Sequence, residues 1–118
     1  LGAVHSCAHA LGAVCDLHHG LANALMIDTV MAWNLPSVPA RFDELAHVCG
    51  VPGGGGAFVA WLQSLKARIG ISGTLASHGV KAEQVPRLVE VASADICHQT
   101  NPRPCTAADF EALFKAAL

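Results

Sequence analysis

The stretch "VHSCAHALGAVCDLHHG", Val4 to Gly20, determines how the first part of the chain folds. Small and apolar residues dominate up to about Val14, without proline, and "CDLHHG" then ends the pattern with a short polar turn. This predicts a first helix over about 1–14 and a second over about 20–33. Four histidines and two cysteines lie within these seventeen residues. The segment is therefore a metal site, a redox pair, or an ordinary helix that carries imidazoles.

The second and third helices have recognisable ends. Asn34, in a left-handed conformation before Leu35-Pro36, is expected to stop the second helix. Ser37 is expected to cap the third helix, with Pro39 in its first turn and Gly50 as its terminator.

The rest of the chain continues the helical pattern. A fourth helix is expected over "AFVAWLQSLKARIG", after the glycines at 53–56, which we interpret as a flexible loop between helices because they lack the features of a phosphate-binding loop. A turn-rich connector at 71–84 and a helix starting near Pro86 follow. Thr106 begins a variant capping box before the last helix. Strand signals are nearly absent, so the predicted fold is all-α, with six or seven helices.

Composition limits the possible functions. The 118 residues suffice for one domain, and 53% of them are hydrophobic, so part of the apolar surface is expected to meet another domain or subunit. A net charge of −2 with scattered basic residues argues against nucleic acid, and no apolar run is long enough to cross a membrane. Five cysteines without a secretory signal indicate reduced thiols in the cytoplasm. The helical pattern already runs at Leu1, so we expect a piece of a longer protein.

The histidines can converge on one object. On a helix His5 and His9 are about 400° apart, hence on one face, whereas Cys7 is about 200° from His5 and leaves that face. Gly12 falls near the same face and offers nearly bare backbone. The turn can bring His18 or His19 back toward the first helix as a third nitrogen donor for Fe, Zn, Cu or Ni.

Four segments, "HSCAH", "HALG", "HHGLANA" and "DICHQTNPRP", occur in the order typical of one enzyme family. With them the chain resembles the C-terminal helical domain of the iron-containing (group III) alcohol dehydrogenases, within the dehydroquinate synthase-like superfamily. The resemblance implies that His5 and His19 are metal ligands. It places His9 near the nicotinamide and in the proton relay as the catalytic residue, with Gly12 beside it in the cofactor site. Cys97 would line the substrate pocket, or else be a small apolar residue.

The resemblance also implies the chemistry. Hydride would pass between a small alcohol or aldehyde and NAD or NADP, with Fe(II), or alternatively Zn(II), polarising the oxygen. The expected unit is a single helical domain over 1–118, which lacks the N-terminal nucleotide-binding domain and the earlier helix that carries an Asp and a His ligand. The isolated chain should therefore be inactive, and the full-length protein is expected to be a homo-oligomer.

Two other functions stay open from the sequence. One is a non-catalytic helical binding or assembly module descended from that family. The other is a small metal-binding protein that uses His5, His18, His19 and Cys15. Metal binding that survives His9→Ala but depends on Cys15 would indicate the latter.

Overall fold

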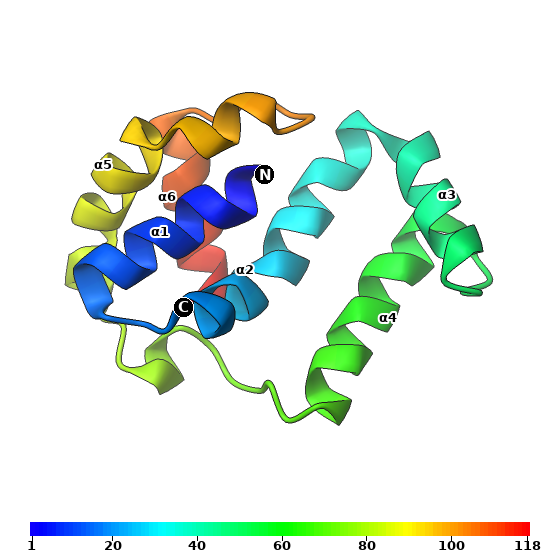
Figure 1. Ribbon diagram of the computed structural model, residues 1–118, viewed down its shortest axis with the longest axis horizontal. Helices are drawn as coiled ribbons and strands as arrows, with labels where there is room; N and C mark the ends of the chain where they lie inside the picture. The colour runs from blue at the N-terminus through cyan, green and yellow to red at the C-terminus, as the bar shows by residue number, and fades with distance from the viewer.

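The computed structural model describes all 118 residues as helices and turns without a strand, which confirms the predicted all-α class (Figure 1). None of the helices is both long and apolar enough to cross a membrane. The α-helices are α1 (Ala3–Cys15), α2 (His19–Asn34), α3 (Pro39–Val48), α4 (Gly54–Arg68), α5 (Val85–Ala94) and α6 (Ala107–Ala117). Short 3-10 turns are η1 (Leu35–Ser37), η2 (Ala76–His78), η3 (Ala82–Gln84) and η4 (Ile96–Thr100).

Helix α1 lies in the middle of the larger core and packs against α2, α5 and η4. Small residues such as Ala3, Ala8 and Ala10 are buried along it and let neighbouring helices approach closely. Phe110 and Phe114 of α6 fill the remaining space from the C-terminal end of the chain. The result is a rigid support for the polar face of α1.

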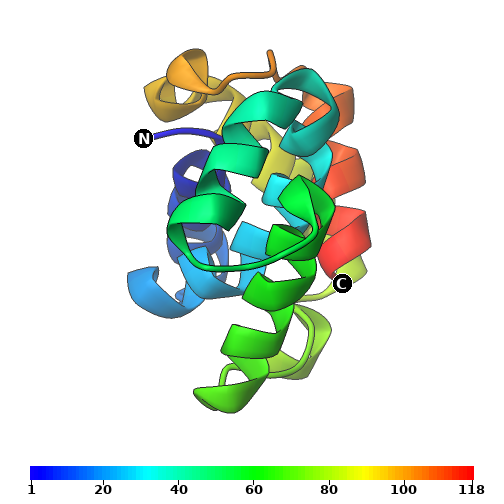
Figure 2. The ribbon, with the colours of Figure 1, turned by 90° about the vertical axis from the view of Figure 1, so that its right-hand side faces the viewer.

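Helices α3 and α4 pair around a second, smaller cluster that contains Phe42 and Phe58. Figures 1 and 2 show this pair on one side of the body, where α4 contacts α2. An ion pair between Lys66 and Asp28, both largely buried, links α4 to α2 at this contact. The two clusters are thus joined mainly through α2.

The glycine run is structured, so the prediction of a flexible loop over 53–56 was wrong. Gly53, with a φ of 105°, is the residue before α4, and Gly54 to Gly56 lie in the first turn of the helix. A Cβ at Gly55 would lie 2.6 Å from the Cβ of Phe42, so glycine permits the close approach of α3 and α4. The Gly55 N–H donates to Oδ1 of Asp43 at 2.8 Å, which satisfies one of the free amides of the helix start.

Two predicted helix ends also differ. Ser37 belongs to η1 and makes no cap, because Val38 is the residue before α3, although Pro39 does begin that helix. Asn34 ends α2 in a right-handed conformation, with φ of −74°, and is buried. It is right-handed because the chain continues directly into the 3-10 turn η1, whose first residue is also right-handed. The side chain of Asn34 has a structural partner. The expected stop at Gly50, with φ of 66°, is confirmed.

That partner is Asn101, from the "NPR" segment. Oδ1 of Asn101 accepts from the Ala3 N–H at 3.2 Å and from Nδ2 of Asn34 at 3.2 Å, while its own Nδ2 donates to Oδ1 of Asn34 at 2.8 Å. Arg103 adds a hydrogen bond of 2.8 Å to the Trp33 carbonyl and lies over the Trp33 ring. These contacts hold the segment after η4 against the start of α1 and the end of α2.

Candidate active site

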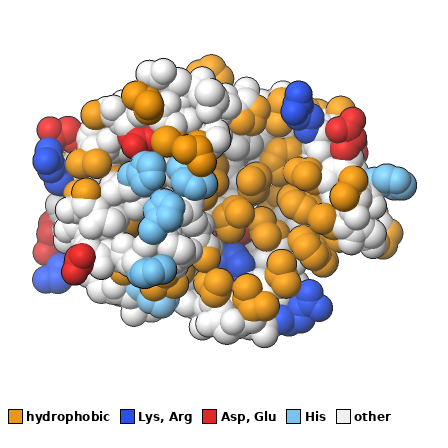
Figure 3. All heavy atoms as spheres, in the orientation of Figure 1, with side chains coloured by type: hydrophobic (Ala, Val, Ile, Leu, Met, Phe, Trp, Pro, Cys, Tyr) orange, Lys and Arg blue, Asp and Glu red, His pale blue; other side chains and the backbone are white.

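Three imidazole rings gather where α1 meets the start of α2. The ring centroids of His5 and His9 are 6.0 Å apart, those of His5 and His19 5.5 Å, and those of His9 and His19 5.4 Å. Figure 3 shows histidines grouped on this face, beside a hollow lined with hydrophobic side chains. The structure therefore brings together the three histidines that the sequence singled out.

A tight turn produces this convergence. Asp16 ends α1 with a left-handed φ of 55°, and its N–H donates to the Gly12 carbonyl at 3.1 Å. The Leu17 N–H donates to the Leu11 carbonyl, which completes the pattern of a left-handed helix end. The chain reverses within three residues, so that His19 at the start of α2 faces α1.

The two adjacent histidines have different roles in the fold. Nδ1 of His18 accepts from the Gly20 N–H at 3.2 Å, so this imidazole caps α2. Its neighbour His19 makes ring contacts with His5 and His9. The sequence allowed either one to return to α1, and the structure selects His19.

His5 is only partly exposed, and its surroundings favour the neutral ring. Burial lowers the pKa of His5 below its ordinary value, and the neighbouring rings of His19 and His9 lower the pKa further. A neutral imidazole has a free lone pair and can bind a metal ion without first losing a proton. The local electrostatics thus suit a nitrogen donor at this position.

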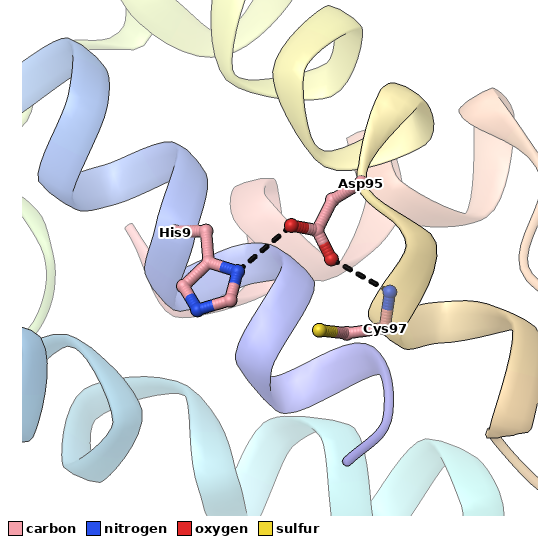
Figure 4. A group of neighbouring side chains, drawn as sticks. All are labelled: His9, Asp95 and Cys97. Atoms are coloured by element: carbon pink, nitrogen blue, oxygen red, sulfur yellow. Dashed lines mark hydrogen bonds and ion pairs between the residues drawn. The ribbon is translucent and has the colours of Figure 1, made fainter.

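His9 has a second partner that the sequence did not indicate. Its Nδ1 lies 2.8 Å from Oδ2 of Asp95, across the junction of α1 and η4 (Figure 4). Oδ1 of Asp95 accepts from Oγ of Ser6 and from the Cys97 N–H, each at 2.8 Å. Burial raises the pKa of Asp95, but the hydrogen bonds from His9, Cys97 and Ser6 together bring it well below its ordinary value.

Cys97 lies beside this pair, and its place in a substrate pocket stays a prediction. Donor atoms of His9, Asp95 and Cys97 all lie within 4.8 Å of one another. Burial raises the pKa of the Cys97 thiol, and a hydrogen bond to Asp95 raises it further. The thiol is therefore protonated at neutral pH and is neither a nucleophile nor a metal ligand in this state.

The other candidate residues of the first helix lie outside the histidine cluster. Gly12 is in the last turn of α1, where a Cβ would be in ordinary van der Waals contact, 3.5 Å from the Leu17 carbonyl oxygen. Its place in a cofactor site stays a prediction. Cys7 is fully buried, and burial raises its pKa far above the ordinary value, which agrees with its exclusion from the site. The pKa of Cys15 is also raised by burial.

A groove of about 480 Å³ adjoins the histidines between α1, α2 and α3. His5 stands at its edge, and apolar side chains such as Ile27, Met31 and Phe42 line it. Asn23 also borders it, and Oδ1 of this residue is buried without a hydrogen-bond partner. Part of the apolar surface that the composition predicted therefore lies in this groove.

Comparison with known proteins shows which family the chain belongs to. The family model described as "Fe-containing alcohol dehydrogenase family, C-terminal" matches residues 1–118. The chain belongs to this family. Among curated relatives, it is 35% identical to a lactaldehyde reductase of Escherichia coli over 124 residues, and 36% identical to an NAD-dependent methanol dehydrogenase of Bacillus methanolicus over 126 residues.

Solved structures of iron-containing alcohol dehydrogenases and related enzymes share the fold. A 1,3-propanediol oxidoreductase superposes with a TM-score of 0.95 at 33% identity, and an alcohol dehydrogenase from Oenococcus oeni with a TM-score of 0.92 at 31% identity. Each comparison covers all of this chain but 33% of the other chain. The curated relatives are matched over 32% and 33% of their lengths. The chain thus spans about a third of the proteins that it resembles.

Proposed function

We propose that this chain is the helical, metal-binding part of an NAD(P)-dependent alcohol dehydrogenase that interconverts small alcohols and aldehydes. The observation that carries the proposal is the convergence of His5, His9 and His19, two of them at the positions where the family resemblance expects metal ligands. The names of the relatives, which include reductases and dehydrogenases of lactaldehyde, methanol and 1,3-propanediol, support a substrate of a few carbons.

The ring geometry fits a shared metal ion. Two imidazoles bound to one tetrahedral ion at about 2.1 Å from each nitrogen have ring centres about 5.3 Å apart. The centroids of His5 and His19 are 5.5 Å apart, with the rings tilted by 52°. Nε2 of His19 lies 3.1 Å from Nδ2 of Asn23, so binding of an ion by this nitrogen would require the amide of Asn23 to move away. The orphaned Oδ1 of Asn23 nearby is consistent with a site that is complete only with further groups.

Two imidazoles form only half of the expected ligand set. The family resemblance assigns an Asp and another His to a helix that is outside these residues, and a metal site normally needs three or four donors. We therefore expect the 118 residues alone to lack activity. Fe(II) is the expected ion, with Zn(II) as the alternative, because three nitrogens and one carboxylate suit both.

His9 has a different task from the ligands. Its Nδ1 is engaged by Asp95, so only Nε2 is free to interact with a reactant. A bound metal would polarise the alcohol or carbonyl oxygen, and the nicotinamide would accept or supply the hydride. His9 would hold the proton that the alcohol releases, and the protonated thiol of Cys97 would border the ring. Homo-oligomerisation and a cytoplasmic location remain predictions.

The test uses the complete protein that contains this chain. Metal content is measured after purification, and oxidation of 1,2-propanediol, 1,3-propanediol and methanol is followed with NAD and with NADP. His5→Ala should remove the bound metal and the activity. His47→Ala is the matched control, because His47 is exposed in the last turn of α3 and away from the cluster. Full activity in His5→Ala, or no dehydrogenase activity in the metal-loaded wild type, would overturn the proposal.

A further inference from the structure

The carboxylate of Asp95 is held in place by two hydrogen bonds besides its contact with His9. Asp95 precedes η4, and its Oδ1 accepts from the Cys97 N–H of that turn at 2.8 Å. The same oxygen accepts from Oγ of Ser6, which is completely buried in α1, also at 2.8 Å. One bond comes from each of the two elements that meet here. The carboxylate therefore has little freedom to rotate.

The second oxygen meets the imidazole. Oδ2 of Asp95 is 2.8 Å from Nδ1 of His9, and the other ring nitrogen points away from the carboxylate (Figure 4). An ionised carboxylate only accepts hydrogen bonds, so Nδ1 must carry a proton and donate it. In the neutral ring, Nε2 then has the lone pair. Ser6 and His9 are three residues apart on α1, so a single helix face supports both the carboxylate and the ring that it holds.

We propose that Asp95 is a positioning residue that fixes the orientation and tautomer of His9, so that Nε2 is presented as the proton acceptor of the reaction. This inference rests on the proposed function. In the oxidation, a hydride leaves the alcohol carbon for the nicotinamide and the hydroxyl proton goes to Nε2 of His9, then to solvent. The products are the aldehyde, the reduced nicotinamide and one proton. Asp95 touches no reactant and acts only through His9.

The decisive variant is Asp95→Asn. Asn has nearly the same size and is an equally good residue before a helical turn, so the bonds from Cys97 and Ser6 can be kept. Its amide, however, places a donor where Oδ2 was. Nδ1 of His9 must then accept, and the proton moves to Nε2, which can no longer accept a proton in the neutral ring. The variant should preserve the fold and invert the tautomer.

Nitrogen NMR of the complete, metal-stripped protein labelled with ¹⁵N-histidine measures this directly. At pH 8 we expect the His9 signals, assigned by their loss in His9→Ala, to show a protonated Nδ1 and an unprotonated Nε2. In Asp95→Asn the pattern should reverse. Asp16→Asn is the matched control: it removes one exposed carboxylate at the end of the same helix, and Asn tolerates the left-handed φ there. That control should leave the His9 signals unchanged.

Kinetics of the metal-loaded protein give the second readout. Asp95→Asn should lower kcat by about 10²–10⁴-fold, with little change in KM, because a ring whose Nε2 carries the proton cannot act as the general base, and general-base catalysis contributes about this factor. Adding Asp95→Asn to His9→Ala should cause no further loss, because Asp95 acts through His9.

The results separate the two proposals. Absence of dehydrogenase activity in the wild type overturns the proposed function. A wild-type His9 with its proton on Nε2, or signals that do not respond to Asp95→Asn, overturns the role of Asp95 whatever the activity. Additive losses in the double variant also overturn it, because they would mean that Asp95 acts elsewhere.

Discussion

Substituting alanine at two consecutive glycines of α4 tests whether the glycine run is part of the α3–α4 packing or a loop. At Gly55 a Cβ would lie 2.6 Å from the Cβ of Phe42 and 2.7 Å from Cδ1 of Leu35. The Cβ of Phe42 is fixed to the α3 backbone, so the two helices would have to separate. At Gly56, one residue further along the same turn, a Cβ would have no neighbouring atom within 4 Å.

The expected difference in unfolding free energy between the two variants follows from their surroundings. Both gain from replacing glycine in a helix, by about 0.5–1 kcal/mol of unfolding free energy. Only Gly55→Ala meets a clash, and overpacking of this kind costs about 1–3 kcal/mol. Gly56→Ala should therefore be more stable than the wild type, and Gly55→Ala should be less stable than Gly56→Ala by about 1–3 kcal/mol.

Urea unfolding of the purified protein, followed by circular dichroism, measures both free energies under identical conditions. Two variants of equal stability would refute the reasoning, because a flexible loop has no neighbour to distinguish the two positions. A large loss in both would also contradict it, since Gly56 has free space around its Cα.

Further predictions concern the metal, acid stability and the asparagine pair. His19→Asn should abolish metal retention while His18→Asn, which keeps a capping side chain, retains most of it; metal analysis checks this, and equal losses would contradict the assignment. Hydrogen bonds from the capping threonine lower the pKa of Asp109, so the stability that this carboxylate contributes is present above about pH 4 and is lost as the pH falls through the lowered pKa. Asp109→Asn should flatten the acid limb of a plot of melting temperature against pH, and an unchanged limb would exclude this role. Asn101→Ala leaves the buried amide of Asn34 unpaired and should lower the unfolding free energy by about 1–3 kcal/mol, measured in urea; no loss would mean that water replaces the bonds.

The spacing of residues in the sequence correctly predicted those features that depend on a single helix. The four-residue interval between His5 and His9 was enough to place both rings on one face, because helix periodicity fixes it. Thr106 caps the last helix as expected, since its capping box with Asp109 needs only the four residues of the motif. The family resemblance, carried by short segments, was confirmed over the whole chain.

Contacts between residues that are far apart in the sequence could not be predicted from the spacing of residues within one segment. Asp95 is 86 residues from His9 in the sequence, so nothing in either segment indicated the pair. The glycine run was misjudged for the same reason. Glycine is a poor helix former, but packing against Phe42 and the hydrogen bond to Asp43 outweigh that preference.

The hydrogen bond between His9 and Asp95 also sets the order of events when the protein is made. At about 5–20 residues per second, the ribosome needs about 4–17 seconds to add the 86 positions that separate these residues. During that interval the imidazole of His9 is already synthesised but has no partner to fix its tautomer. Contacts of such long sequence separation also form late in folding, because the intervening loop must close first. The contact between His9 and Asp95 can therefore form only after Asp95 has been synthesised, whereas the hydrogen bonds within the first helix need only residues that are close in the sequence.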